Sequence, residues 1–457
     1  MKKAIVLFRR ELRLQDNQAL NAALESGLFI VPIFIFTPEQ VEKNPYGSDF
    51  AIGFMLESLL ELSKAIKRQH GKLFIFYGRQ HQVIKCLLKS DTDIAHLYAN
   101  SDVTPYSIKR DGDIEKACGQ HGVACSFYDD HLMFPRNSVL TQGHTPFKIF
   151  TPFYRQAKTL SIPPATNKTR FRFIHKLTHN LKEMTLHEAQ GFSSQKNTGA
   201  FIGGRSHALK ILKRLPQHEH YDENRDELSS DTTGLSPYLK FGCLSIREAY
   251  WGISDGLHRP ELLLRQLYWR EFFYNLALAF PHVFGSSFHQ KYDAISWSED
   301  RASFERWSEA KTGVPVVDAA MRNLNETGFI TNRARLIAAS FLTKLLLIDW
   351  RWGERYFANK LIDYDPAVNN GNWQWVAGSG ADAQPYFRII NPWRQAQKFD
   401  PEAQYIKRWL PELAHLSSKE IHRWHEQRYP QPNYPAPMIY YPLAKELALE
   451  TYRIALR

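Results

Sequence analysis

Short apolar runs alternate with amphipathic stretches along the first 130 residues. Unbroken runs of aliphatic and aromatic residues predict buried strands at residues 4–8, 27–36, 72–78, 96–100 and 124–130. Between these runs, apolar residues recur at helical spacing in residues 50–68, 82–88 and 108–121. Apolar strands separated by helices are typical of a sheet that is covered on both faces. We therefore expect an α/β fold with a doubly wound, Rossmann-like parallel sheet.

The pattern changes twice further along the chain. Residues 131–198 contain Pro163, Pro164 and many Ser, Thr and Asn residues, which predicts a connector that runs over the surface. Beyond residue 199 almost every stretch has helical periodicity, at residues 206–215, 246–252, 260–278, 314–325, 332–347 and 352–361. We expect three parts: an α/β domain (1–130), a connector (131–198) and a larger all-helical domain (199–457).

Composition narrows the class of protein. Lys and Arg number 58 against 47 for Asp and Glu, an excess of 11 positive charges. This excess favours a polyanionic partner, nucleic acid first, although a merely basic cytosolic protein is the alternative. The first strand is not followed by the Gly-x-Gly-x-x-Gly pattern, so we do not expect a hydride-transfer domain.

Cysteine spacing and apolar run length bear on the compartment. Four cysteines, at positions 86, 118, 125 and 243, lack metal-site spacing, so we expect reduced thiols in the cytoplasm and no metal. No apolar run reaches membrane length, and the one at the start is too short for a signal peptide. We expect no membrane partner.

Tryptophan is concentrated near one polar stretch. Residues 348–375 contain Trp350, Trp352, Trp373 and Trp375 around two carboxylates and two carboxamides, Asp363, Asp365, Asn369 and Asn370. Two interpretations are open: a packed helical core, or a site that holds a large, flat and polar group.

Three short motifs suit anion or base binding. Residues 231–237 place small hydroxyl residues and a glycine before a helix, which suits a diphosphate but also an ordinary helix cap. Residues 265–272 and 332–335 interleave arginines with other side chains. Such segments suit base stacking and phosphate contact, or form half of an amphipathic helix or a solvated surface.

Taken together, seven motifs carry a family resemblance. They occur in order from Phe8 to about Leu413, at residues 8–17, 232–242, 267–273, 312–328, 345–357, 361–375 and 385–392. The chain resembles the DNA photolyase/cryptochrome family, and within it most resembles the class I cyclobutane pyrimidine dimer photolyases.

The resemblance implies a U-shaped FAD in the helical domain. By position, its ligands are Tyr221, Thr232, Thr233, Gly234, Leu235, Ser236, Arg335, Asp363, Asp365 and Asn369. Arg335 is expected to pair with Asp363, and Asn369 is expected to face flavin N5. A tryptophan triad, Trp373, Trp350 and Trp297, would carry an electron hole from the flavin to the surface.

The resemblance also implies that a pyrimidine dimer is flipped out of DNA. Trp269 and Trp375 would hold the dimer between aromatic faces. The pocket and backbone contacts would come from Arg225, Gln266, Arg270, Asn332, Arg333, Leu336, Arg388 and Gln395. Gln266 and Asn332 count as catalytic here, beside Asn369 and the triad.

Departures from the family pattern concern the substrate. Dimer-repair enzymes usually have Glu and Met where this chain has Gln266 and Leu336, whereas (6-4) photolyases have histidines at the positions of Asn332 and Leu336. Cyclobutane dimer repair needs no obligatory proton transfer, so we expect light-driven dimer repair by a deoxyribodipyrimidine photo-lyase. A cryptochrome-type blue-light photoreceptor is the second expectation and a (6-4) photolyase the third.

The resemblance leaves the antenna open. A folate, a deazaflavin or a flavin could act as a second chromophore in the α/β domain, near residues 104–111 and 147–155. We further expect a cytoplasmic monomer, associated with the nucleoid if the source is bacterial.

Overall fold

The computed structural model describes residues 1–42, 44–193, 199–426 and 433–457. Packing divides them into two compact units. The sheet unit comprises residues 1–219, 233–281 and 362–364, and the helical unit comprises residues 220–232, 282–361 and 365–457. Compact packing units need not coincide with sequence domains. The expected domain boundaries at residues 130 and 198 therefore stay predictions.

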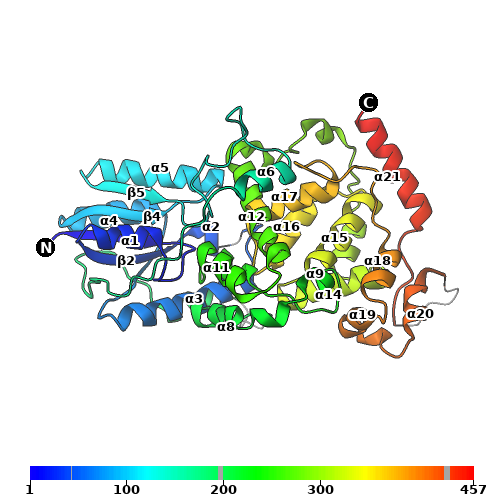
Figure 1. Ribbon diagram of the computed structural model, residues 1–457, viewed down its shortest axis with the longest axis horizontal. Coiled ribbons are helices and arrows are strands. Elements are labelled where there is room, and N and C mark those ends of the chain that lie inside the picture. Colours follow the sequence, from blue (N-terminus) through cyan, green and yellow to red (C-terminus); the bar gives the residue numbers. More distant parts are fainter. Residues whose placement is uncertain (43, 194–198, 427–432) are drawn as a thin grey trace. The chain divides into compact units, whose positions relative to one another are not determined.

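A five-stranded parallel sheet is the centre of the sheet unit, in the order β3-β2-β1-β4-β5. Its strands are β1 (Lys3–Phe8), β2 (Phe29–Phe36), β3 (Phe74–Tyr77), β4 (Ile94–Asn100) and β5 (Ala124–Tyr128). Figure 1 shows these strands surrounded by helices in the blue to cyan part of the ribbon. Ile5, Ile84, Leu97 and Ile114 are fully buried in the shared core. The expected doubly wound fold is confirmed.

The helices of the sheet unit come from the strand crossovers and from later parts of the chain. The crossover helices are α1 (Gln18–Glu25), α2 (Pro38–Val41), α3 (Asp49–Lys67), α4 (Gln80–Ser90) and α5 (Pro105–Gly119). The others are α6 (Phe150–Ala157), α7 (Leu186–Ala189), α8 (Arg205–Lys213), α10 (Ser236–Lys240), α11 (Ile246–Gly256) and α12 (Glu261–Ala279).

The helical unit contains no named strand among its described residues. Its helices are α9 (Tyr221–Asn224), α13 (Arg301–Ser308), α14 (Pro315–Thr327), α15 (Asn332–Ser340), α16 (Trp350–Lys360), α17 (Pro366–Ala377), α18 (Pro392–Phe399), α19 (Gln404–Trp409), α20 (Ser418–His422) and α21 (Tyr441–Ala455). Over both units, short 3-10 turns lie at Gln190–Phe192, Leu215–His218, Pro281–Val283, Gln290–Ala294, Pro411–Leu413 and Trp424–Glu426. Among the described residues of the whole chain, no helix is long and apolar enough to cross a membrane.

Several elements differ from the sequence expectations. The helix expected over residues 332–347 ends at Ser340 and continues as a π-helical turn, Phe341–Leu345. Helices α1, α6 and α17 are not evident from the hydrophobic pattern of the sequence. Two of these begin with a side-chain cap: Asn17 accepts a hydrogen bond from the Leu20 N–H, and Asp365 accepts from the Ala367 and Val368 N–H groups.

A buried network of four charged side chains joins the sheet to α11 within the sheet unit. Arg13 donates to Asp130 at 2.6 Å. Arg247 donates to Asp130 at 2.9 Å and to Asp16 at 2.8 Å. Burial opposes ionisation of Asp130, but the two arginines outweigh it and lower the pKa of the carboxyl to about 2. The network therefore holds the loops after β1 and β5 against α11.

Candidate functional site

Asn369 and Glu354 meet inside the helical unit, on α17 and α16. Both side chains are buried. The Asn369 amide Nδ2 donates to the Glu354 backbone carbonyl at 3.2 Å and to its carboxylate Oε1 at 3.0 Å. Because two acceptors need the NH₂ group, the amide orientation is fixed. The Asn369 Oδ1 accepts no bond from the residues that the structure describes, so a carbonyl acceptor remains for a ligand N–H.

Four further expected cofactor ligands lie in the helical unit. Asp365 is committed to the start of α17 as its N-cap, where Oδ1 accepts from the Ala367 N–H at 3.1 Å. The Arg335 guanidinium donates from Nε to the Ile330 carbonyl at 2.9 Å. Tyr221 begins α9, and burial raises the pKa of its phenol. Thr232, like Tyr221, is half-buried.

The remaining expected ligands, residues 233–236 and Asp363, lie in the sheet unit. Ser236 donates from Oγ to the Asp363 carboxylate at 2.7 Å. Gly234 has a φ of +64°, and a Cβ there would lie 2.4 Å from the Phe201 ring, so only glycine fits the turn. Thr233 is half-buried and Leu235 is buried. Arg335 and Asp363 belong to different units, so their expected ion pair stays a prediction.

All three tryptophans of the expected triad lie in the helical unit. Trp373 on α17 is 3% exposed and Trp350 on α16 is 1% exposed, whereas Trp297 is half-buried. Trp297 is thus the most exposed of the three, which suits the outer end of an electron chain. A Cβ on Gly353 would lie 2.2 Å from the Trp373 ring, so the missing side chain lets that ring rest against α16. The distances along the chain stay a prediction.

Trp269 presents an aromatic surface on α12 of the sheet unit. It is half-buried, and its ring stacks parallel to Phe150 of α6, with centroids 3.6 Å apart and planes 6° apart. Gln266, one turn earlier, donates from Nε2 to the Leu262 carbonyl at 3.0 Å. The second N–H and the carbonyl of Gln266 remain for a ligand.

Two neighbouring side chains fix α12 within the unit. Arg270 donates to the His131 carbonyl at 2.7 Å and to the Tyr274 hydroxyl at 3.3 Å. Glu271 is 1% exposed and accepts from the Met133 N–H at 3.1 Å. Burial raises the pKa of Glu271 to about 7. Two Arg270 donors are thus held inside the protein, and its expected contact with DNA stays a prediction.

The other expected DNA contacts lie in the helical unit. Arg333 on α15 forms a salt bridge with Asp226 at 2.9 Å and donates to the Gln395 carbonyl oxygen at 3.2 Å. Its guanidinium also lies 4.1 Å from the Phe399 ring centroid. The structure therefore brings Arg333 and Gln395 together.

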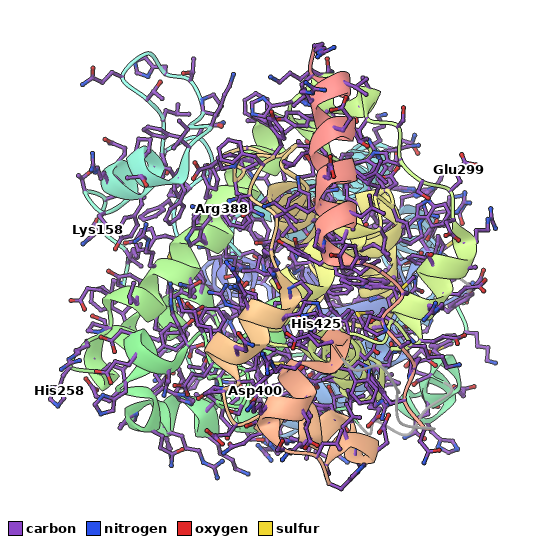
Figure 2. The ribbon with its side chains drawn as sticks, turned by 90° about the vertical axis from the view of Figure 1, so that its right-hand side faces the viewer. Lys158, His258, Glu299, Arg388, Asp400 and His425 are labelled. Carbon is purple, nitrogen blue, oxygen red and sulfur yellow. The ribbon has the colours of Figure 1, made fainter. Side chains whose placement is uncertain are left out.

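The last expected contacts differ in exposure. Asn332 and Arg388 are exposed, and Figure 2 labels Arg388 before α18. Arg225, Leu336 and Trp375 are half-buried. Roles in substrate binding stay predictions for all of these residues.

Comparison with known proteins gives the family. Residues 4–169 match DNA photolyase, and residues 263–454 match the FAD binding domain of DNA photolyase. A deoxyribodipyrimidine photo-lyase of Vibrio cholerae is 37% identical over 99% of both chains. The chain belongs to the DNA photolyase family.

Solved structures agree with this assignment. An archaeal photolyase from Sulfolobus tokodaii with two FAD molecules is 39% identical, with a TM-score of 0.90 over 99% of this chain and 100% of that one. A Synechocystis cryptochrome is 28% identical, with a TM-score of 0.91 over 99% of both chains.

The match to the FAD binding domain confirms the expected cofactor. The side chains fit it, since the free Asn369 carbonyl can accept from a flavin N–H and Arg335 supplies a cation. Sequence reasoning missed Glu354, Gly353 and Phe150, which position the expected residues. Gly353 carried a signal: a glycine inside a helical pattern beside tryptophans indicates close packing.

Proposed function

We propose that this chain is a deoxyribodipyrimidine photo-lyase, which repairs cyclobutane pyrimidine dimers in DNA under light. The observation that carries the proposal is the Trp269 ring, half-buried and backed by Phe150 at 3.6 Å. A planar surface with one face supported suits stacking of a base extruded from the duplex. The net charge of +11 adds attraction for phosphates that does not depend on sequence.

Residue types at the positions that the family resemblance assigns to the substrate support the lesion class. Bound in its reduced form, FAD would supply one electron to the dimer and receive it back. Gln266 offers a neutral N–H donor to the pyrimidine carbonyls, which stabilises negative charge on the dimer without repelling it. Neither Asn332 nor Leu336 can act as the protonated acid that (6-4) repair requires, so we rank that activity third.

Asn369 and the three tryptophans would support the cofactor. The amide held by Glu354 presents a carbonyl acceptor, which would accept a hydrogen bond from a protonated flavin N5 and so favour the fully reduced, anionic flavin. Trp373, Trp350 and Trp297 would carry the hole outward, because indoles oxidise more easily than most side chains.

One assay separates the candidates. The flavin is reduced, oligonucleotides carrying a cyclobutane dimer or a (6-4) product are added, and loss of each lesion is followed under near-UV or blue light. We expect loss of the cyclobutane dimer alone. A reduced, illuminated protein that repairs neither lesion would contradict the proposal and favour a blue-light receptor, the second candidate, which the likeness to the Synechocystis cryptochrome supports.

Gln266 gives a matched pair of variants for this assay. We expect Gln266→Leu to lower the repair yield per absorbed photon about tenfold, because a donor to developing charge is lost. We expect Gln266→Glu, the usual family residue, to raise the yield where its carboxyl is protonated, because the acid O–H is a strong donor to developing charge. Equal yields in all three proteins would remove Gln266 from the substrate site.

An antenna chromophore, a monomeric state and a cytoplasmic, DNA-associated location belong to the same proposal. The Sulfolobus tokodaii protein carries two FAD molecules. Its example makes a flavin one antenna candidate beside a folate and a deazaflavin. The absorption spectrum of the material released on denaturation tests this, since FAD alone in a 1:1 ratio would leave no antenna.

A further inference from the structure

Arg265 on α12 is a half-buried cation that lacks an anionic partner among the described residues. Its Nε is buried without a hydrogen-bond acceptor. Instead, the guanidinium lies over two rings of α6, 5.3 Å from the Phe150 centroid and 5.4 Å from the Tyr154 centroid. A second cation, Lys158, lies 5.5 Å from the same Tyr154 ring and is exposed (Figure 2).

Among the described residues, the other buried and half-buried arginines of the sheet unit do have acceptors. A carboxylate or a carbonyl oxygen accepts a hydrogen bond from each of Arg10, Arg13, Arg205, Arg247 and Arg270. Both cations lie against the Tyr154 ring, and their charges add to a local positive potential. Stacking on aromatic rings holds the Arg265 guanidinium in place while most of its N–H donors stay available.

The position of Arg265 indicates what would bind there. The Phe150 ring that meets Arg265 also stacks on Trp269. Arg265 and Trp269 lie one helical turn apart on the same side of α12, about 6 Å along its axis. A planar cation beside an aromatic surface matches a nucleotide strand, in which each base is followed by a phosphate.

We propose that Arg265, with Lys158 beside it, binds one phosphodiester of the DNA strand next to the base that stacks on Trp269. The inference rests on the proposed function and extends it to two residues that the family motifs do not assign. Such a contact fixes the register of the strand and is the same for damaged and undamaged DNA.

Salt dependence of binding tests the inference. A labelled duplex with one cyclobutane dimer, and the same duplex without it, are titrated between about 50 and 200 mM salt. Arg265→Met keeps an apolar stem over the rings and removes the charge. We expect roughly tenfold weaker binding of both duplexes at low salt. We also expect the slope of log affinity against log salt to become shallower by about 0.9.

Matched variants separate charge from packing. Arg265→Lys should keep the slope. The double variant Arg265→Met, Lys158→Met should change the slope by about 0.9 and not by twice that, since one phosphate is shared. The control is Arg68→Gln, which removes an exposed arginine at the end of α3, the helix before the edge strand β3. This variant should change neither the affinity nor the salt slope.

An unchanged slope in Arg265→Met overturns the inference, including the case in which affinity falls through altered packing of Trp269. The near-UV circular dichroism of the tryptophans identifies that case. Failure of the unaltered protein to bind either duplex overturns the proposed function itself and the inference with it.

Discussion

The contact between Asn369 and Glu354 decides which end of one amide is available. A free asparagine could present either its NH₂ group or its carbonyl. In this protein both Nδ2 bonds go to Glu354, so only Oδ1 faces away from α16. The sequence identified Asn369 through its motif. The partner that orients it could not be predicted, because nothing in a helical pattern shows which residues of two helices meet.

Gly353 provides a test of packing around Trp373. A methyl group at this position would lie 2.2 Å from the Trp373 ring and 2.6 Å from Leu342. We expect Gly353→Ala to lower the free energy of unfolding by about 1–3 kcal/mol, because an overfilled core forces side chains off their preferred rotamers. Urea unfolding measures this, and near-UV circular dichroism reports the displaced indole.

Gly112 is the matched control for Gly353. It also lies inside a helix, α5, but a Cβ there would meet no atom within 4 Å. Gly112→Ala should stabilise the protein by up to about 1 kcal/mol, since alanine has the higher helix propensity. Equal effects of the two substitutions would contradict close packing at Gly353.

At the scale of elements, the π-helical turn Phe341–Leu345 carries a buried amine. Lys344 is fully buried, and its Nζ donates to the Ala377 carbonyl at 2.8 Å. The same Nζ lies 3.7 Å from the centroid of the Tyr452 ring on α21. The turn thus links the ends of α17 and α21 through one side chain. Single π-helical turns inside α-helices are frequent at functional sites.

This amine predicts a pH dependence of stability. Burial lowers the pKa of Lys344 from 10.5 to about 7. Between those values the unfolded chain binds more protons than the folded one, so this group makes stability rise as pH increases from about 7 to 10. Below pH 7 the full cost of burying the charge remains.

Substitution of the amine isolates this contribution. Lys344→Met should lose it, reducing the slope of unfolding free energy against pH by up to about 1 kcal/mol per unit. Urea unfolding at several pH values from about 6.5 to about 9.5 measures this slope, because most of the expected change lies in that range. The exposed Lys398, which also lies near a ring, is the control, and Lys398→Met should keep the original slope. An identical slope in Lys344→Met would show that the amine does not titrate in this range.

Element prediction from the sequence succeeded where burial makes the pattern simple. Strands such as β1 and β2 are apolar on both faces, and α3 and α12 are long enough to repeat their period. Helix α6 was not predicted because it has only eight residues and lies in a segment with several prolines. Helix α17 was not predicted because its asparagines and tryptophans interrupt the apolar helical period. Site residues came from motifs, whereas their supports depend on tertiary contacts.

At the scale of the whole molecule, the two compact units do not follow the order of the chain. The sheet unit takes in α8 and α10–α12 from later in the sequence. Asp130 is buried, with 1% of its surface exposed. It pairs there with two arginines from distant segments of the chain, Arg13 and Arg247. Breaking a buried pair is costly, because it leaves the partner charge without compensation.

Acid unfolding tests this network. The pKa of Asp130 lies at about 2, below the ordinary 3.8, so its contribution to stability is present above about pH 4 and is lost as pH falls toward 2. We expect Asp130→Asn to lower the free energy of unfolding by about 3–5 kcal/mol at pH 7. Neighbouring Asp129 pairs with Arg136 at a part-exposed site, and Asp129→Asn should cost less than about 1 kcal/mol. Similar costs for the two variants would mean that the buried network adds little.

The Phe150 ring, which stacks on Trp269, bears on how the proposed lesion preference could change. Phe150 lies in α6, in a stretch that reads from sequence as a mere linker. Because this ring stacks on the indole, a substitution of Phe150 would change the orientation of the proposed base-stacking surface while every residue of α12 stayed the same. Variants that alter the proposed lesion preference therefore include position 150 as well as positions in α12.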